Sequence, residues 1–148
     1  MSQHQSNITR TLVWSNMHSD IRKLGVRLAD KHYTGIIAVS RGGLIPATIL
    51  SHQWGVPIVG VIDVKSYNDE NMTPSEARVE FSSHIENSKD NNWVIVDDLY
   101  DTGQTSRFLE RIFHHYEQVF ICSKNINCPH QYQRLLPPFE WLIFPWEK

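Results

Sequence analysis

The sequence predicts an α/β domain with a central, mostly parallel sheet flanked by helices. Three short apolar runs bounded by turn residues, at 35–40, 93–96 and 118–122, are typical of strands buried in such a sheet. Helical patterns lie between these runs, and strands that alternate with helices pair in parallel. A chain of 148 residues is long enough for one domain with its own core, so we expect a single domain over 1–148.

The first helix is expected over 15–31. Apolar positions recur at three- and four-residue steps between 17 and 28, which predicts an amphipathic helix, and either Ser15 or Asn16 is a suitable cap. The apolar run 35–40 then supplies the first strand.

A second helix and a second strand are expected at 44–54 and 56–64. Pro46 is tolerated only in the first turn of a helix, and Gly55 suits the end of one. Residues 65–92 are mostly polar. A polar segment of this length inside a compact domain is usually a flexible lid or binding loop, less often a plain linker.

The second half of the chain completes the predicted sheet. A third strand at 93–96 leads to a helix at 105–116 and a fourth strand at 118–122. A last strand is expected at 139–144, after a loop that contains several prolines.

Composition and charge exclude several classes of protein. Hydrophobic residues make up 41% of the chain and charged residues 20%, which excludes a disordered tail and a membrane-embedded protein. The formal net charge is −2 and no basic block occurs, so nucleic acid is not an expected partner. Small phosphates remain possible ligands.

The cysteines and the N-terminus indicate a reducing compartment. Cys122 and Cys128 lack zinc-site spacing and are expected to be free thiols. The N-terminal segment has no apolar core like that of a signal peptide, and no apolar run is long enough to span a membrane. We therefore expect a cytoplasmic protein, with peripheral membrane association left open.

Polar segments follow two of the predicted strands, where the binding site of a parallel sheet lies. The first strand leads to Ser-Arg-Gly-Gly at 40–43, and the third leads to Asp-Asp-Leu-Tyr-Asp-Thr-Gly-Gln-Thr at 97–105. The second segment opens a helix, where N–H groups and hydroxyls can cradle an anion. Asp97 and Asp98 can only accept hydrogen bonds, which suits ribose hydroxyls or a cation such as Mg²⁺. The pattern predicts a ribose 5-phosphate site, although Asp and Thr before a helix are also ordinary caps.

Two stretches carry a resemblance to a known family. Residues 94–105, Val-Ile-Val-Asp-Asp-Leu-Tyr-Asp-Thr-Gly-Gln-Thr, resemble the phosphoribosyl pyrophosphate (PRPP) signature of type I phosphoribosyltransferases. Residues 35–46 resemble the pyrophosphate-loop region of the bacterial xanthine-guanine branch of that family. The resemblance implies the type I phosphoribosyltransferase fold, with a lid loop at about 65–92 and a short purine-binding end at about 124–148.

The resemblance also implies which residues bind PRPP. Arg41 and Gly42 would hold the pyrophosphate, in a loop that usually contains a cis peptide. Asp97 and Asp98 would bind the ribose hydroxyls and Mg²⁺, with Asp98 as the metal contact. The residues implied for the 5′-phosphate are Thr102, Gly103, Gln104 and Thr105.

The base would be bound by residues from three segments. Asp101 would face the purine near N7 as the general base, and Lys124 would meet the 6-oxo group. Trp141 would stack on the base while the backbone of Leu142 meets its 2-substituent. Without the resemblance, Trp141 would be assigned to the core and Lys124 to a solvated strand end.

The implied reaction transfers the 5-phosphoribosyl group from PRPP to N9 of guanine, xanthine or hypoxanthine and releases pyrophosphate, with Mg²⁺ as cofactor. Asp101 and Arg41 are the implied catalytic residues, and the family suggests a homo-oligomer, either a dimer or a tetramer. Two alternatives use the same features. One is a non-catalytic PRPP or nucleotide sensor of the same fold; the other is a phosphatase or receiver domain, whose acidic cluster would lie by the first strand. The sequence leaves open the preference among the three purines and a role for Glu147.

Overall fold

The computed structural model describes residues 8–64 and 89–148, which form two parallel sheets. The larger sheet has five strands in the order β3-β2-β4-β5-β6, and all its pairs are parallel. Its strands are β2 (Gly35–Ser40), β3 (Ile58–Asp63), β4 (Trp93–Tyr100), β5 (Glu117–Ser123) and β6 (Gln131–Leu135). The smaller sheet pairs β1 (Ile8–Thr11) with β7 (Glu140–Ile143).

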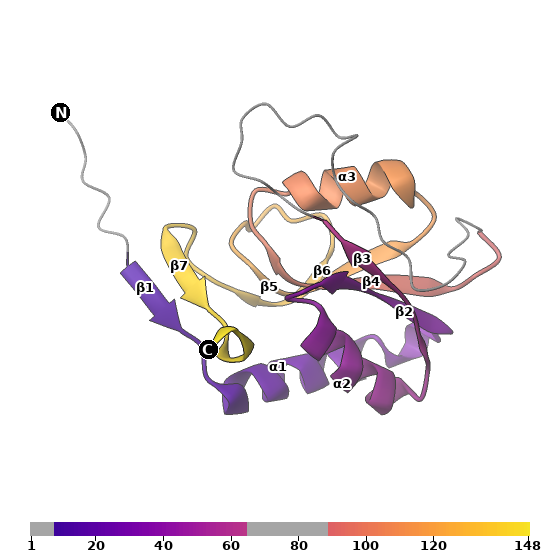
Figure 1. Cartoon of the computed structure of the whole chain (residues 1–148), viewed down its shortest axis with the longest axis horizontal. Helices are drawn as coiled ribbons and strands as arrows, with labels where there is room; N and C mark the ends of the chain where they lie inside the picture. Colours follow the sequence, from indigo (N-terminus) through magenta and orange to yellow (C-terminus); the bar gives the residue numbers. More distant parts are fainter. Residues whose placement is uncertain (1–7, 65–88) are drawn as a thin grey trace.

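Helices cover both faces of the larger sheet (Figure 1). Helices α1 (Trp14–Arg27) and α2 (Leu44–Trp54) pack against each other on one face, and α3 (Gln104–Ile112) lies on the opposite face. Two short 3₁₀ turns, η1 (Ala29–Lys31) and η3 (Pro145–Glu147), complete the described elements. The predicted α/β class with a parallel, helix-flanked sheet is therefore confirmed.

The core forms two layers because the central strands are apolar on both faces. Ile36 and Ala38 of β2 belong to the cluster under α1 and α2. Ile37 and Val39 alternate with them and belong to the cluster under α3. Alternation of this kind is what a continuous apolar run gives in a parallel strand, whose side chains point to opposite faces in turn.

Several predicted boundaries were wrong, among them those of the first and third helices. The first helix ends at Arg27 rather than Lys31, and its N-cap is Val13 rather than Ser15 or Asn16. The third helix spans 104–112 rather than 105–116, because Phe113 leaves helical geometry.

Most of the predicted lid at 65–92, namely residues 65–88, lies outside the described residues. Within the described part, the side chain of Asn92 donates hydrogen bonds to the backbone carbonyls of Lys31 and His32 at the end of η1.

Both cysteines are free, as expected. Cys122 is buried on β5, and burial raises the pKa of its thiol to about 12. In the described parts of the chain, no helix is both long and apolar enough to cross a bilayer.

Candidate active site

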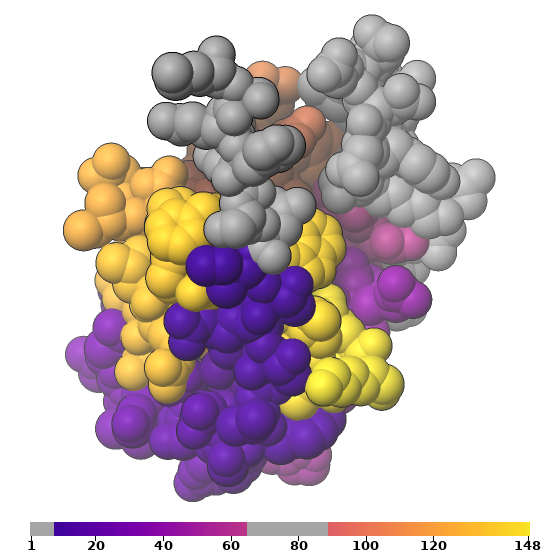
Figure 2. Space-filling model, turned by 90° about the vertical axis from the view of Figure 1, so that its left-hand side faces the viewer, coloured from indigo at the N-terminus to yellow at the C-terminus, as the bar shows by residue number. Residues whose placement is uncertain are grey.

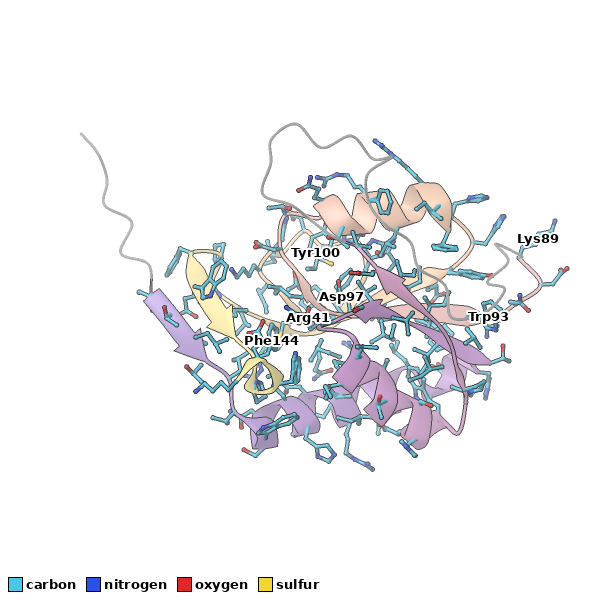
Figure 3. The ribbon with its side chains drawn as sticks, viewed as in Figure 1. Arg41, Lys89, Trp93, Asp97, Tyr100 and Phe144 are labelled. Atoms are coloured by element: carbon cyan, nitrogen blue, oxygen red, sulfur yellow. The ribbon has the colours of Figure 1, made fainter. Side chains whose placement is uncertain are left out.

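A cavity of about 620 Å³ opens at the carboxyl ends of β2 and β4. Parallel strands end at the same edge of a sheet, so the segments that follow them meet there. The lining includes the predicted residues Arg41, Gly42, Asp97, Asp98 and Thr105, together with Trp146 and Glu147 from η3. Figure 3 shows Arg41 and Asp97 at this edge. Two segments more than 50 residues apart in the sequence therefore share one cavity.

The loop after β2 is packed tightly against β4. Its first peptide bond, Ser40–Arg41, is cis. A Cβ added at Gly42 would lie 2.1 Å from Oδ2 of Asp98, so glycine is what allows this carboxylate to lie against the loop backbone. The Arg41 side chain is exposed along the cavity and makes no ion pair with any residue of 8–64 or 89–148. An unpaired guanidinium beside a backbone loop is suited to bind a phosphate group.

Asp97 and Asp98 lie within β4, not after it as predicted, because the strand continues to Tyr100. The backbone N–H of Asp98 donates to Oδ1 of Asp97 at 2.8 Å. Burial, and then repulsion from Asp98, raises the pKa of Asp97 well above its usual range. Burial also raises the pKa of Asp98, and the charge of Glu147 adds to this effect. Carboxylates that repel one another at a cavity wall are suited to bind a cation.

The segment 101–105 surrounds a second, smaller cavity of about 70 Å³. Gly103 caps α3 with a φ of 83°, a conformation that side-chain-bearing residues rarely adopt. Arg107, which the sequence analysis did not single out, donates from Nη1 to the Thr102 carbonyl at 3.2 Å. The sequence could have indicated Arg107, because it lies in the first turn of α3, directly after the predicted phosphate segment. The first residues of α3, Gln104 and Thr105, line this cavity, and N–H groups in the first turn of a helix are suited to bind an anion.

Lys124 and Asp101 lie together at the outer end of this segment. The Lys124 Nζ is 3.8 Å from Oδ2 of Asp101, and its backbone N–H donates to the Tyr100 carbonyl at 2.9 Å. The Lys124 side chain is only 8% exposed. Lys124 is therefore not the solvated strand end that its sequence position alone would indicate.

Trp141 and Leu142 lie on β7, outside the larger sheet. Trp141 is 67% exposed, which excludes the alternative that it belongs to the core, and Leu142 is buried. An exposed indole on a strand is available for stacking.

Glu147 and Trp146 were not assigned roles from the sequence, yet both line the larger cavity. Oε2 of Glu147 accepts a hydrogen bond from the Phe144 backbone at 2.7 Å. The Trp146 ring stacks on Phe144 with centroids 4.9 Å apart. The C-terminal 3₁₀ turn thus closes one wall of the cavity and adds a third carboxylate to it.

Comparisons with known proteins identify the family of this chain. Residues 13–120 match the phosphoribosyl transferase domain family. The chain is 34% identical over 143 residues to a xanthine-guanine phosphoribosyltransferase of Gluconobacter oxydans, covering 93% of this chain and 83% of that protein. It is 30% identical over 139 residues to the protein of the same name from Chromohalobacter salexigens, with the same coverage.

A solved structure is similar over nearly the whole chain. The purine phosphoribosyltransferase of Pyrococcus horikoshii superposes with a TM-score of 0.76 at 30% identity, covering 95% of each chain. The resemblance, the fold and the enzyme class expected from the sequence are confirmed, and the comparisons give no support to the non-catalytic sensor. The chain belongs to the phosphoribosyltransferase family of pentosyl-transferring enzymes.

Proposed function

We propose that this protein transfers the 5-phosphoribosyl group from PRPP to N9 of a 6-oxopurine and releases pyrophosphate. One observation carries the proposal: the buried Lys124 lies beside Asp101, at the outer end of the segment that forms the small anion cavity. In this arrangement a cation that can bind a base contacts Asp101, which also lines the small cavity assigned to the phosphate. The 34% identical relative is named for xanthine and guanine, both of which carry a 6-oxo group.

The 5′-phosphate is assigned to the small cavity. Thr102, Gly103, Gln104 and Thr105 line it, and they supply backbone N–H groups and hydroxyls at the start of α3. These donors, together with the helix dipole, favour a doubly charged phosphate.

The ribose and Mg²⁺ are assigned to Asp97 and Asp98. Burial is the first cause of the raised pKa of both carboxylates, and each is also repelled by another carboxylate, so a divalent cation would be bound favourably by the pair. No group of three or more His, Cys, Asp or Glu side chains in the described ranges is arranged to hold a metal. Mg²⁺ commonly takes one or two carboxylates and completes its shell with substrate phosphates and water, which matches this donor set. When bound, Mg²⁺ neutralises charge on the departing pyrophosphate.

The pyrophosphate is assigned to the loop after β2. Arg41 is free to form a two-pronged contact with phosphate oxygens, and the absence of a Cβ at Gly42 gives close access to the backbone. Asp98 lies against Gly42, so the metal-binding carboxylate and the pyrophosphate loop lie side by side.

The purine is assigned to Asp101, Lys124, Trp141 and Leu142. Lys124 donates to the 6-oxo group, which an adenine lacks, and Asp101 accepts the proton that the purine loses as the N9 bond forms. Trp141 offers its exposed ring for stacking. The backbone of Leu142 meets the 2-substituent.

Bond cleavage at C1 of the ribose develops oxocarbenium character, as in glycoside chemistry. The work of the protein is then to orient the two substrates and to stabilise charge. Arg41 stabilises the negative charge of the leaving pyrophosphate, and Asp101 accepts the proton from the purine. The segment 65–92 is assigned the task of excluding water, so that PRPP is transferred rather than hydrolysed.

Pyrophosphate release tests the proposal directly. The protein is incubated with PRPP, Mg²⁺ and guanine, xanthine, hypoxanthine or adenine in separate reactions. Release is expected with at least one oxopurine and not with adenine. The absence of pyrophosphate release with all three oxopurines contradicts the proposal.

A further inference from the structure

The strand that carries Trp141 and Leu142 is held by a strand from the other end of the chain. β1 pairs in parallel with β7, with Thr9 opposite Trp141 and Arg10 opposite Leu142. Figure 2 shows the residues of β1 lying against the C-terminal segment. All four residues of β1 are exposed, and a two-stranded sheet is marginal on its own. Further interactions must therefore fix β7 in place.

An ion pair between Arg10 and Glu140 supplies such an interaction. Nη2 of Arg10 donates to Oε1 of Glu140 at 2.8 Å, and its Nε donates to Oε2. The Glu140 side chain is only 7% exposed, whereas that of Arg10 is 48% exposed. A two-pronged contact of this kind fixes orientation as well as distance, because both groups are planar. It joins the first residue of β7 to the middle of β1.

Glu140 also lies within electrostatic reach of the base site. The hydrogen bond from Arg10 has the largest effect in holding the pKa of Glu140 below its usual range, and the charge of Lys124 lowers this pKa further. Lys124 in turn contacts Asp101. Charges of alternating sign therefore run from Arg10 through Glu140 and Lys124 to Asp101.

We propose that Arg10 and Glu140 form a positioning pair for the purine site, an inference that rests on the proposed function. The pair holds β7 in register, which sets the places of Trp141 and Leu142. The negative charge of Glu140 also attracts the ammonium of the buried Lys124, which binds the base in the proposed function. Neither residue touches the substrate, and neither contributes to the cavity that binds PRPP.

The test compares Michaelis constants for the two substrates. Glu140→Gln keeps the shape of the side chain and removes its charge, and Arg10→Lys keeps the charge and removes the two-pronged contact. Both variants are expected to raise KM for the purine by about ten- to a hundredfold, the cost of a small displacement at a binding site, and to leave KM for PRPP unchanged. Arg10→Lys is the informative variant if Glu140→Gln does not fold.

Asp20 and Arg134 provide a matched control. They form the same kind of two-pronged pair, with distances of 2.6 and 3.1 Å, and Asp20 is buried at 4% exposure. This pair joins α1 to β6, and neither of its residues lies on β1 or β7. Asp20→Asn is expected to lower Tm without a selective change in KM for the purine.

The possible results separate the two claims. If the wild-type protein shows no turnover with any oxopurine, the proposed function is wrong and this inference is overturned with it. If the wild type is active and Glu140→Gln or Arg10→Lys shifts both Michaelis constants equally, or neither, only the positioning role is overturned.

Discussion

The charged form of Asp97 is unfavourable in the folded protein but is needed for the proposed binding of substrate. Its carboxylate is half-buried beside Asp98 at the wall of the larger cavity, and burial and repulsion both disfavour its charged form in the folded protein. In the proposed function the same charge is needed for ribose and Mg²⁺. The site therefore lowers the stability of the free protein in order to bind a cationic complex of its substrate.

Replacing Asp97 with Asn is expected to stabilise the free protein at neutral pH. Because the pKa of Asp97 is raised on folding, the folded state binds this proton more tightly than the unfolded state does. The stabilising effect of that proton is complete below about pH 4 and is lost as the pH rises through the folded-state pKa. At pH 7, without Mg²⁺ or PRPP, Asp97→Asn should raise Tm by about 2–4 °C or more. Differential scanning calorimetry at pH 4 and pH 7 measures this; an equal shift at both values contradicts the explanation.

Asp101 is expected to act in the chemical step. Asp101→Asn removes the proposed proton acceptor but leaves a side chain of the same size beside Lys124. A general base contributes about 10²- to 10⁴-fold, so kcat/KM should fall by that factor while Tm stays close to that of the wild type. Steady-state kinetics with the preferred oxopurine checks this prediction. Activity near the wild-type level would show that another group takes the purine proton.

At the level of elements, the loop between β2 and α2 places two adjacent glycines in different surroundings. The three atoms nearest to a Cβ at Gly42 would all belong to the Asp98 side chain. A Cβ at Gly43 would lie 2.4 Å from the Val96 carbonyl oxygen and 2.7 Å from that of Val39, both of them backbone atoms of the central sheet. A side chain can rotate away, whereas a strand in the middle of the sheet cannot.

Alanine at Gly42 should therefore affect substrate binding, whereas alanine at Gly43 should affect stability. Gly42→Ala is expected to fold and to raise KM for PRPP, because Asp98 must move from its place beside the loop. Gly43→Ala is expected to lower the free energy of unfolding by about 1–3 kcal/mol or more, as overpacked sites do. Urea unfolding and kinetics on both proteins measure the difference, and equal losses of stability would contradict it.

The sequence predicted the elements that are locally encoded and missed those that depend on distant partners. Apolar runs identified β2 and β5 because buried parallel strands are apolar throughout. β6 was missed because it is half-buried and mostly polar, and among the described strands it lies at the edge of the sheet beside β5. β1 was missed because its partner β7 lies some 130 residues away, and four exposed residues carry no pattern of their own.

The same distinction holds for the candidate site. The segments at 41–42 and 97–105 are contiguous motifs, and the structure brings residues from both to one cavity. The end of β4 was placed at Val96 because the apolar run stops there, but pairing with β5 extends the strand through both aspartates. The contact of Arg10 with Glu140 and the lining role of Glu147 arise only from tertiary packing, so no local motif indicates them.

For the whole molecule, substrate binding should be coupled to stability. In the proposed function, PRPP with Mg²⁺ would bridge residues from β4, the start of α3 and the loop after β2, so it would bind the folded chain and not the unfolded one. A ligand at a hundred times its Kd stabilises by about 2.7 kcal/mol. Tm should therefore rise in the presence of both PRPP and Mg²⁺, and by less with PRPP and EDTA. A thermal shift assay over a series of PRPP concentrations measures this, and an unchanged Tm contradicts PRPP binding.

The central claim is a transfer reaction, so the most direct measurement follows both products of PRPP at once. The protein is given PRPP, Mg²⁺ and a single oxopurine, and the pyrophosphate released is compared with the purine nucleotide formed. Transfer predicts one nucleotide, linked at N9, for every pyrophosphate. Pyrophosphate released without nucleotide, or no release at all with guanine, xanthine and hypoxanthine, would contradict the account.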